Sequence, residues 1–162
     1  MVDRHIAFHE IYEHRQWGDG VDVPLSGPGS SMEYTASLRA ALPFLIQKFK
    51  IETILDAGCG DMTWMQHVQL PDNVHYHGVD IVESVIEKNK ALEKTNFRFS
   101  VGDIVEDEME YADLVICRDV LFHLSNKSIS SFLENFLDSE SDYLLTTSHT
   151  GVLDNEDISD GG

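Results

Sequence analysis

The feature that most constrains the fold is an alternation of short apolar runs with helical segments, which begins near residue 53. Five of the runs have the length and composition of β-strands, at residues 53–55, 74–79, 97–101, 112–117 and 143–147. Helical spacing of apolar residues occupies residues 31–49, 62–68, 82–92 and 129–137. Pro43 is expected to split the first of these or to open a second short helix. Strands that alternate with helices predict an α/β fold, with a parallel sheet covered by helices on both faces.

Length and charge narrow the class of protein further. A chain of 162 residues fits one domain, and 42% hydrophobic with 25% charged residues excludes wholesale disorder. The balance of 29 acidic against 11 basic residues gives a net charge of −18, with no basic patch. Such a surface repels a phosphate backbone, so no nucleic-acid partner is expected. Solubility, including solubility in salty surroundings, is the simplest explanation of the acidity.

Cysteine and histidine usage argues against a disulfide or a metal site. Cys59 and Cys117 lack a CxxC partner, and the eight histidines show no metal-binding spacing. No apolar stretch approaches the roughly 18 residues of a membrane span, and residues 1–15 lack the apolar core of a signal peptide. We therefore expect a cytoplasmic protein with no membrane partner.

Three of the predicted strands are followed or ended by an aspartate: Asp56, Asp80 and Asp103. The carboxyl ends of parallel strands share one edge of a sheet, where ligands bind in open α/β folds. Gly58 and Gly60, just past the first strand, allow a sharp turn and a close approach by a ligand. Asp80 lies 20 residues beyond Gly60, where an acid can hold both ribose hydroxyls. Capping of the next helix by Asp80, and ordinary loop chemistry for Asp103, remain as alternatives.

The loop after the first strand does not suit a pyrophosphate. Thr63 stands where a nicotinamide-binding fingerprint has its third glycine, and Asp61 adds negative charge where a diphosphate would sit. A cofactor with adenine and ribose but no phosphate fits better. S-adenosylmethionine is such a molecule, and its sulfonium and ammonium groups suit an acidic loop.

Over residues 30–149 the chain resembles the class I S-adenosylmethionine-dependent methyltransferases. Four ordered motifs carry the resemblance: Asp56-Ala57-Gly58-Cys59-Gly60, Val79-Asp80-Ile81, Gly102-Asp103-Ile104 and residues 113–124. The resemblance implies a Rossmann-like three-layer α/β/α sandwich with a mostly parallel sheet of strand order 3-2-1-4-5. The usual sheet of this family has seven strands, and only five are predicted here. The sheet is thus expected to be truncated.

The resemblance also implies roles for individual residues. Gly58 and Gly60 would lie against the methionine part of the cofactor, Asp80 would bind the ribose, and Asp103 would receive the adenine amino group. Ile81 and Ile104 would flank the adenine ring, and Arg118 would contact the methionine end, largely through its backbone. The full expected cofactor set is Asp56, Ala57, Gly58, Cys59, Gly60, Asp80, Ile81, Gly102, Asp103, Ile104 and Arg118.

The same comparison suggests a domain layout. Residues 1–31 resemble an N-terminal lid, residues 32–150 form the S-adenosylmethionine-binding domain, and residues 151–162 form an acidic tail that is expected to fray.

Two side chains are candidates for catalysis. His123 follows the fourth strand and titrates near neutrality, so it could act as a base; alternatively it is a helix-start or core residue. Asp119 could orient the acceptor or the cofactor ammonium, or it could be an acid at a helix N-terminus. Trp17 and Trp64 could wall the pocket or belong to the core.

The predicted function is S-adenosylmethionine-dependent methyl transfer to an unidentified, small-molecule acceptor. The alternative is a non-catalytic module that binds S-adenosylmethionine or S-adenosylhomocysteine, or a truncated methyltransferase fragment. A nicotinamide-dependent oxidoreductase is a third hypothesis, which Thr63 opposes. The fifth strand lies at a sheet edge, so it is expected to form a homodimer, to be covered by the residues from Gly151 onward, or to fray.

Overall fold

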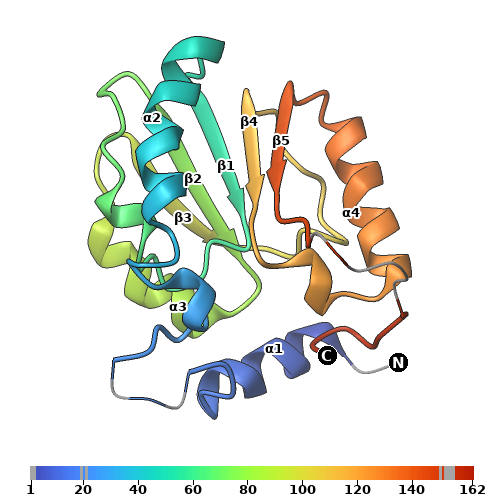
Figure 1. Cartoon of the computed structure of the whole chain (residues 1–162). Helices are drawn as coiled ribbons and strands as arrows, with labels where there is room; N and C mark the ends of the chain where they lie inside the picture. Colours follow the sequence, from blue (N-terminus) through green and yellow to red (C-terminus); the bar gives the residue numbers. More distant parts are fainter. Residues whose placement is uncertain (1–2, 19, 21, 150, 152–155) are drawn as a thin grey trace.

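In the computed structural model, which describes residues 3–18, 20, 22–149, 151 and 156–162, five parallel strands form one sheet (Figure 1). The sheet order is β3-β2-β1-β4-β5, which confirms the predicted fold class and strand order. The strands are β1 Thr53–Ala57, β2 His75–Asp80, β3 Phe97–Val101, β4 Leu114–Cys117 and β5 Tyr143–Thr146.

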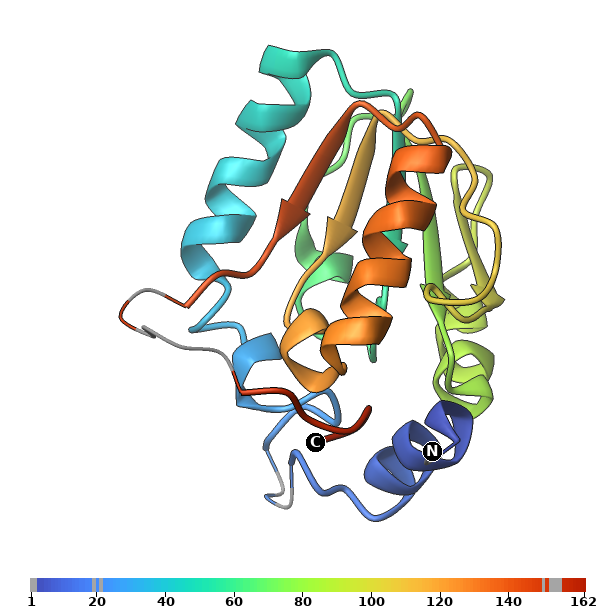
Figure 2. The same cartoon turned by 90° about the vertical axis from the view of Figure 1, so that its right-hand side faces the viewer.

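Helices cover both faces of the sheet, as Figures 1 and 2 show. On one face lie α2 (Ala36–Phe49) and α3 (Glu83–Asn89), whose buried Leu42 and Ile86 join the main apolar core. On the other face lies α4 (Asn126–Asp138), whose fully buried Phe132 packs among strand residues such as Val115. Successive strand residues point to opposite faces, so β4, with four buried residues, serves both cores.

Several predicted helix boundaries were wrong, for identifiable reasons. Pro43 does not split α2, because buried Leu42 and Ile46 anchor the helix on both sides of it. Residues 62–68 contain only a short 3₁₀ turn, η2 (Met65–His67), and Met62 has a left-handed φ of 59° that interrupts any longer helix. The third helical segment, predicted at residues 82–92, is present as α3 followed directly by the 3₁₀ turn η3 (Lys90–Leu92).

The N-terminal segment contains a helix that the sequence analysis did not predict. This helix, α1 (Arg4–Glu13), begins after Asp3, whose side chain accepts a hydrogen bond from the backbone N–H of His5. It lies across the carboxyl edge of the sheet, below the ends of the strands in Figure 1. Its buried Phe8, Ile11 and Tyr12 form a second cluster with residues of the loops that follow the strands. The helix therefore closes the side of the sheet on which ligands are expected.

The expectation of a frayed tail is wrong for residues 156–162. This segment runs beside α1 and the start of α4 (Figures 1 and 2), and the side chains of Asp157 and Asp160 accept hydrogen bonds there. Unpaired N–H groups at the start of α4 supply the attraction that orders it. Among the described residues, no helix is both long and apolar enough to cross a membrane.

Candidate functional site

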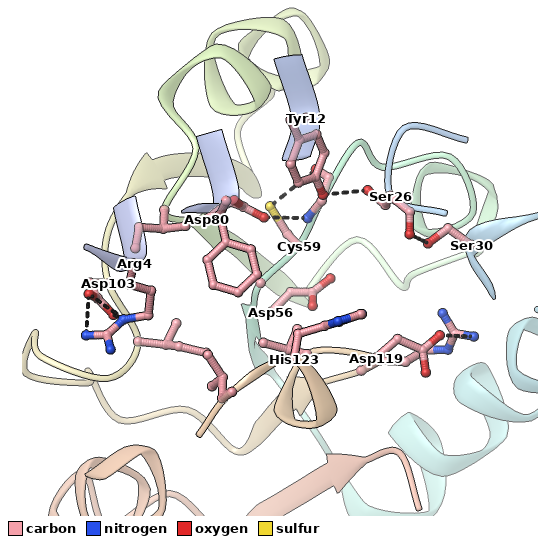
Figure 3. A pocket seen from close by; sticks show the side chains of 18 of the residues that line it. Arg4, Tyr12, Ser26, Ser30, Asp56, Cys59, Asp80, Asp103, Asp119 and His123 are labelled. Carbon is pink, nitrogen blue, oxygen red and sulfur yellow. Dashed lines mark hydrogen bonds and ion pairs between the residues drawn. The ribbon is translucent and has the colours of Figure 1, made fainter. Parts of the chain in front are cut away.

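A pocket lies at the carboxyl edge of the sheet, enclosed by the strand ends, α1 and the 3₁₀ turn η4 (Leu121–His123) (Figure 3). Most of the residues predicted for the site line it. They are Asp56, Gly58, Cys59, Gly60, Asp80, Ile81, Gly102, Asp103, Ile104, Arg118, Asp119 and His123. Trp17 and Trp64 also line it, although Trp64 is at the same time part of the core. Ala57 is fully buried against the α4 face and does not reach the pocket.

The glycine loop after β1 is held tightly by its neighbours. The backbone N–H groups of Gly58 and Cys59 both donate to the carbonyl of Val79, at 2.8 and 3.0 Å. Gly58 has φ of 83°, and a Cβ there would lie 2.5 Å from Cγ2 of Val120. At Gly60, with φ of 59°, a Cβ would lie 2.3 Å from Oγ of Ser26. Both positions need glycine for the turn itself and for the close approach of other parts of the chain.

Asp80 is buried at the end of β2, 6% exposed, and its carboxylate organises the loop. One oxygen accepts from the Gly60 N–H at 2.9 Å and the other from the Val82 N–H at 3.0 Å. Burial raises the pKa of Asp80, and these backbone donors oppose the rise. Helix α3 begins at Glu83 with Val82 as its N-cap, so Asp80 is not the capping residue considered from the sequence. A carboxylate has about four acceptor positions, so two remain for a ligand.

Asp56 is the second buried carboxylate of the pocket. It is 2% exposed and accepts a hydrogen bond from the hydroxyl of Tyr76 at 2.6 Å. Burial raises its pKa to about 7; repulsion from Asp80 adds to the rise, while the Tyr76 bond and Arg118 oppose it. A cationic ligand in this pocket would favour the ionised form of Asp56.

Arg118 and Asp119 form an ion pair at the end of β4. Nη2 of Arg118 lies 2.8 Å from Oδ2 of Asp119 and donates to the carbonyl of Gly29 at 2.8 Å. The guanidinium also lies over the ring of Trp64, so the side chain of Arg118, and not only its backbone, faces the site. Asp119 has a left-handed φ of 56° and accepts from the Thr147 hydroxyl at 2.7 Å. It belongs to a turn and not to a helix N-terminus, since Val120 is the N-cap of η4.

His123 lines the pocket from the 3₁₀ turn η4. Its ring stacks on Trp17, with centroids 4.4 Å apart. Nδ1 is 2.9 Å from the carbonyl oxygen of Gly162, so Nδ1 carries the proton and donates. Burial lowers the pKa of His123, which keeps the ring neutral near pH 7. The remaining nitrogen, Nε2, is then the basic atom of the ring.

The structure adds pocket residues that the sequence analysis missed, and Arg4, Phe8 and Tyr12 among them come from α1. Arg4 pairs with Asp103, through Nη2 and Oδ2 at 2.9 Å and through Nε at 3.0 Å. Tyr12 shares a hydrogen bond of 2.8 Å with Ser26, whose oxygen also accepts from the Asp61 N–H. A signal for α1 was present: Asp3 is a suitable cap, and Phe8, Ile11 and Tyr12 follow helical spacing.

Comparison with known families identifies the class of the protein. A family model described as "Methyltransferase domain" matches residues 48–151. The chain therefore belongs to this methyltransferase-domain family, in agreement with the resemblance found in the sequence motifs. No curated protein sequence matches the chain.

Solved structures with a similar fold include two methyltransferases with bound ligands. Magnesium protoporphyrin IX methyltransferase from Synechocystis PCC 6803 with bound S-adenosylmethionine is 21% identical, with a TM-score of 0.64 over 89% of this chain and 76% of that one. The N-methyltransferase NodS from Bradyrhizobium japonicum WM9, in complex with S-adenosylhomocysteine, is 14% identical, with a TM-score of 0.60 over 85% and 68%.

A third neighbour, the methyltransferase domain of a bacterial Hen1, is 16% identical, with a TM-score of 0.59 over 67% of this chain. The match spans 63% of the length of that domain. These neighbours establish the Rossmann-like methyltransferase fold.

Proposed function

We propose that the chain binds S-adenosylmethionine in the pocket and transfers its methyl group to a small-molecule acceptor. The observation that carries the proposal is the pair of buried carboxylates, Asp56 and Asp80, that face the pocket beside the glycine loop. Two buried acids, one with a pKa of about 7, favour a ligand that brings positive charge. S-adenosylmethionine brings a sulfonium and an ammonium group and carries no phosphate.

The lining residues fit the parts of this cofactor. Asp80 has free acceptor positions for the ribose hydroxyls, and Asp103 is an acceptor suited to the adenine amino group. Ile81 and Ile104 are half-buried apolar side chains of the pocket that would flank the adenine ring. The glycine loop leaves main-chain atoms accessible to the methionine part, near Arg118.

The bound cofactor supplies a methyl group made reactive by the sulfonium. The task of the chain is then to position the acceptor and to remove a proton where the acceptor is an O–H or N–H group. We assign proton removal to Nε2 of His123, since the ring is neutral and Nδ1 is already held by the Gly162 carbonyl. Asp119, fixed by Arg118 and Thr147, would orient the acceptor or the cofactor ammonium.

A non-catalytic module that binds the same cofactor is the second candidate. The same lining residues would hold the cofactor in either candidate. In both candidates residues 1–31 would act as a lid on the pocket, because α1 supplies Arg4, Phe8 and Tyr12 to the pocket lining. The two candidates differ in turnover and agree in cofactor binding.

Isothermal titration calorimetry of the full chain tests the shared part of the proposal. S-adenosylmethionine and S-adenosylhomocysteine are expected to bind with one-to-one stoichiometry, and NAD is expected to give no signal. Binding of NAD in place of the two adenosyl ligands would overturn the proposal. Release of S-adenosylhomocysteine with a panel of small O–H and N–H acceptors then separates the enzyme from the binding module, with His123→Ala as the variant expected to lose turnover but retain cofactor.

A further inference from the structure

The segment of residues 156–162, called the docked segment below, is held by a dense set of contacts. Oδ1 of Asp157 accepts from the Asn126 N–H at 2.8 Å, and Oδ1 of Asp160 accepts from the Ser125 N–H at 2.7 Å. These two N–H groups belong to the start of α4, where the helix leaves backbone donors unpaired and its dipole favours negative charge. Two carboxylates three residues apart thus cap the N-terminus of α4.

The second oxygen of Asp160 reaches two side chains from other elements. Oδ2 accepts from the hydroxyl of Ser128 at 2.7 Å and from Nη1 of Arg4 at 2.6 Å. Ser128 is 6% exposed, so its hydroxyl is a buried polar group that the segment satisfies. Burial alone would raise the pKa of Asp160, but the donors from Ser125, Ser128 and Arg4 hold it below its ordinary value.

The two glycines of the segment fit between α1 and η4. The N–H of Gly161 donates to the carbonyl of His123 at 2.7 Å, and Nδ1 of His123 donates to the carbonyl of Gly162 at 2.9 Å. Gly161 has φ of 89°, and a Cβ there would lie 2.9 Å from Cβ of Ala7. A larger residue at position 161 would meet both a backbone penalty and a steric one.

We propose that α1, η4 and the first turn of α4 form a binding site for an acidic peptide of the pattern Asp-x-x-Asp-Gly-Gly, occupied here by residues 157–162. The site recognises the two carboxylates through helix N–H groups, Ser128 and Arg4, and it recognises the glycines through His123. The occupied site covers the His123 wall of the pocket. Since it holds Nδ1 of the proposed base, an acceptor must approach from the Nε2 side or displace the segment, a consequence that rests on the proposed function.

Amide hydrogen exchange of the full chain, labelled with ¹⁵N-glycine, tests the docked state directly. The Gly161 amide is expected to be protected, and Asp160→Asn should speed its exchange at least about tenfold, because it removes charge-assisted bonds to Arg4 and Ser128. Asp138→Asn, an exposed aspartate at the other end of α4, is the matched control and should leave the exchange unchanged. An unprotected Gly161 in the unmodified chain would overturn the proposal.

A second experiment tests whether the surface is a site for the peptide and not only a resting place of the chain. The probe is a fluorescein-labelled peptide Glu-Asp-Ile-Ser-Asp-Gly-Gly, followed by fluorescence anisotropy. Gly161→Val ejects the docked segment and leaves the site residues intact, so it should bind the probe at least about tenfold more tightly than the unmodified chain. Gly151→Val is the control for backbone strain: Gly151 also has a positive φ, of 98°, but a Cβ there would meet nothing within 4 Å, so this variant should keep the docked segment in place and bind the probe as the unmodified chain does.

Equal probe binding by all three proteins, or equal binding of a probe with both aspartates changed to asparagine, would refute the site. Circular dichroism checks that both valine variants are folded. Neither experiment uses the cofactor. Protection of Gly161 without any binding of S-adenosylmethionine would therefore support the peptide site and refute the proposed function. Binding of S-adenosylmethionine without protection of Gly161 would support the proposed function and refute the peptide site.

Discussion

Replacing Asp80 by asparagine separates the proposed cofactor role of this residue from its structural role. Its carboxylate accepts from the Gly60 and Val82 N–H groups, and it is buried. Asparagine keeps one oxygen acceptor and places an NH₂ group against the other donor. Asp80→Ala would weaken cofactor binding similarly, but it would leave both N–H groups unpaired. Asparagine therefore disturbs the structure less while it removes the charge.

Two magnitudes follow from this geometry. One unpaired buried N–H costs about 1–3 kcal/mol of unfolding free energy. For a chain of this length each kcal/mol corresponds to about 2–4 °C in melting temperature. Loss of the charged acceptor for the ribose hydroxyls costs about 1.5–3 kcal/mol of binding free energy. The dissociation constant for S-adenosylhomocysteine should therefore rise by a factor of about 10–150.

Calorimetric titration at a temperature well below the melting transition measures the binding term, and circular dichroism on heating measures the stability term. Asp138→Asn is the control, since that exposed side chain is far from the pocket lining. A folded Asp80→Asn variant whose dissociation constant lies within twofold of the unmodified chain would refute the reasoning. The ribose would then be held elsewhere, and the role of Asp80 would be confined to fixing the glycine loop.

Three further predictions concern other parts of the chain. Gly58→Val should abolish cofactor binding, because Cβ would lie 2.5 Å from Val120 and φ is positive; titration with normal affinity on a folded variant would contradict this. Burial holds the pKa of Asp56 at about 7, so the contribution of this carboxyl group to the free energy of unfolding should fall as the pH rises from about 4 to 7. The preference for cationic S-adenosylmethionine over neutral S-adenosylhomocysteine should increase between pH 6 and 8, and a flat calorimetric ratio would exclude Asp56 as the responsible group. Finally, β5 pairs only with β4 among the described residues, so its other edge is open to a second copy of the chain. Sedimentation should show a homodimer at high salt and a monomer at low salt, where the acidic chains repel one another. A monomer at every salt concentration would rule out pairing through this edge.

The placement of the pocket could be predicted from the sequence because it depends on strand order and on local signals. Asp56, Asp80 and Asp103 each stand at or just beyond the end of a strand, and the parallel register brings those ends to one edge. Gly58 was also identified from local conformation alone. The turn and the approach of a ligand were the reasons to expect glycine there. The structure adds a third reason, since the side chain of Val120 approaches position 58 from a distant part of the chain. Periodicity gives the faces of strands and helices, but it does not give the partner of a loop.

The roles of α1 and of residues 156–162 could not be predicted, because their order depends on contacts between distant segments. Arg4 meets Asp103 at a separation of 99 residues and Asp160 at a separation of 156. In isolation, a ten-residue helix and a short acidic segment are both marginal. Backbone donors at the start of α4, the buried hydroxyl of Ser128 and the carboxylate of Asp103 make the ordered arrangement favourable. None of these interactions leaves a pattern within one stretch of sequence.

Arg4 links the two proposed sites, and this link has a thermodynamic consequence. Its guanidinium contacts Asp103, the proposed acceptor for the adenine amino group, and at the same time Asp160 of the docked segment. A cofactor whose adenine amino group donates to Asp103 must share that carboxylate with Arg4. This sharing changes the strength of the ion pair between Arg4 and Asp160. Coupling between two ligands is reciprocal, so release of the docked segment must change cofactor affinity by the same factor by which the cofactor changes the docking of the segment. Gly161→Val in the calorimeter, read beside Gly161 exchange with and without S-adenosylhomocysteine in the unmodified chain, measures the two sides of this cycle.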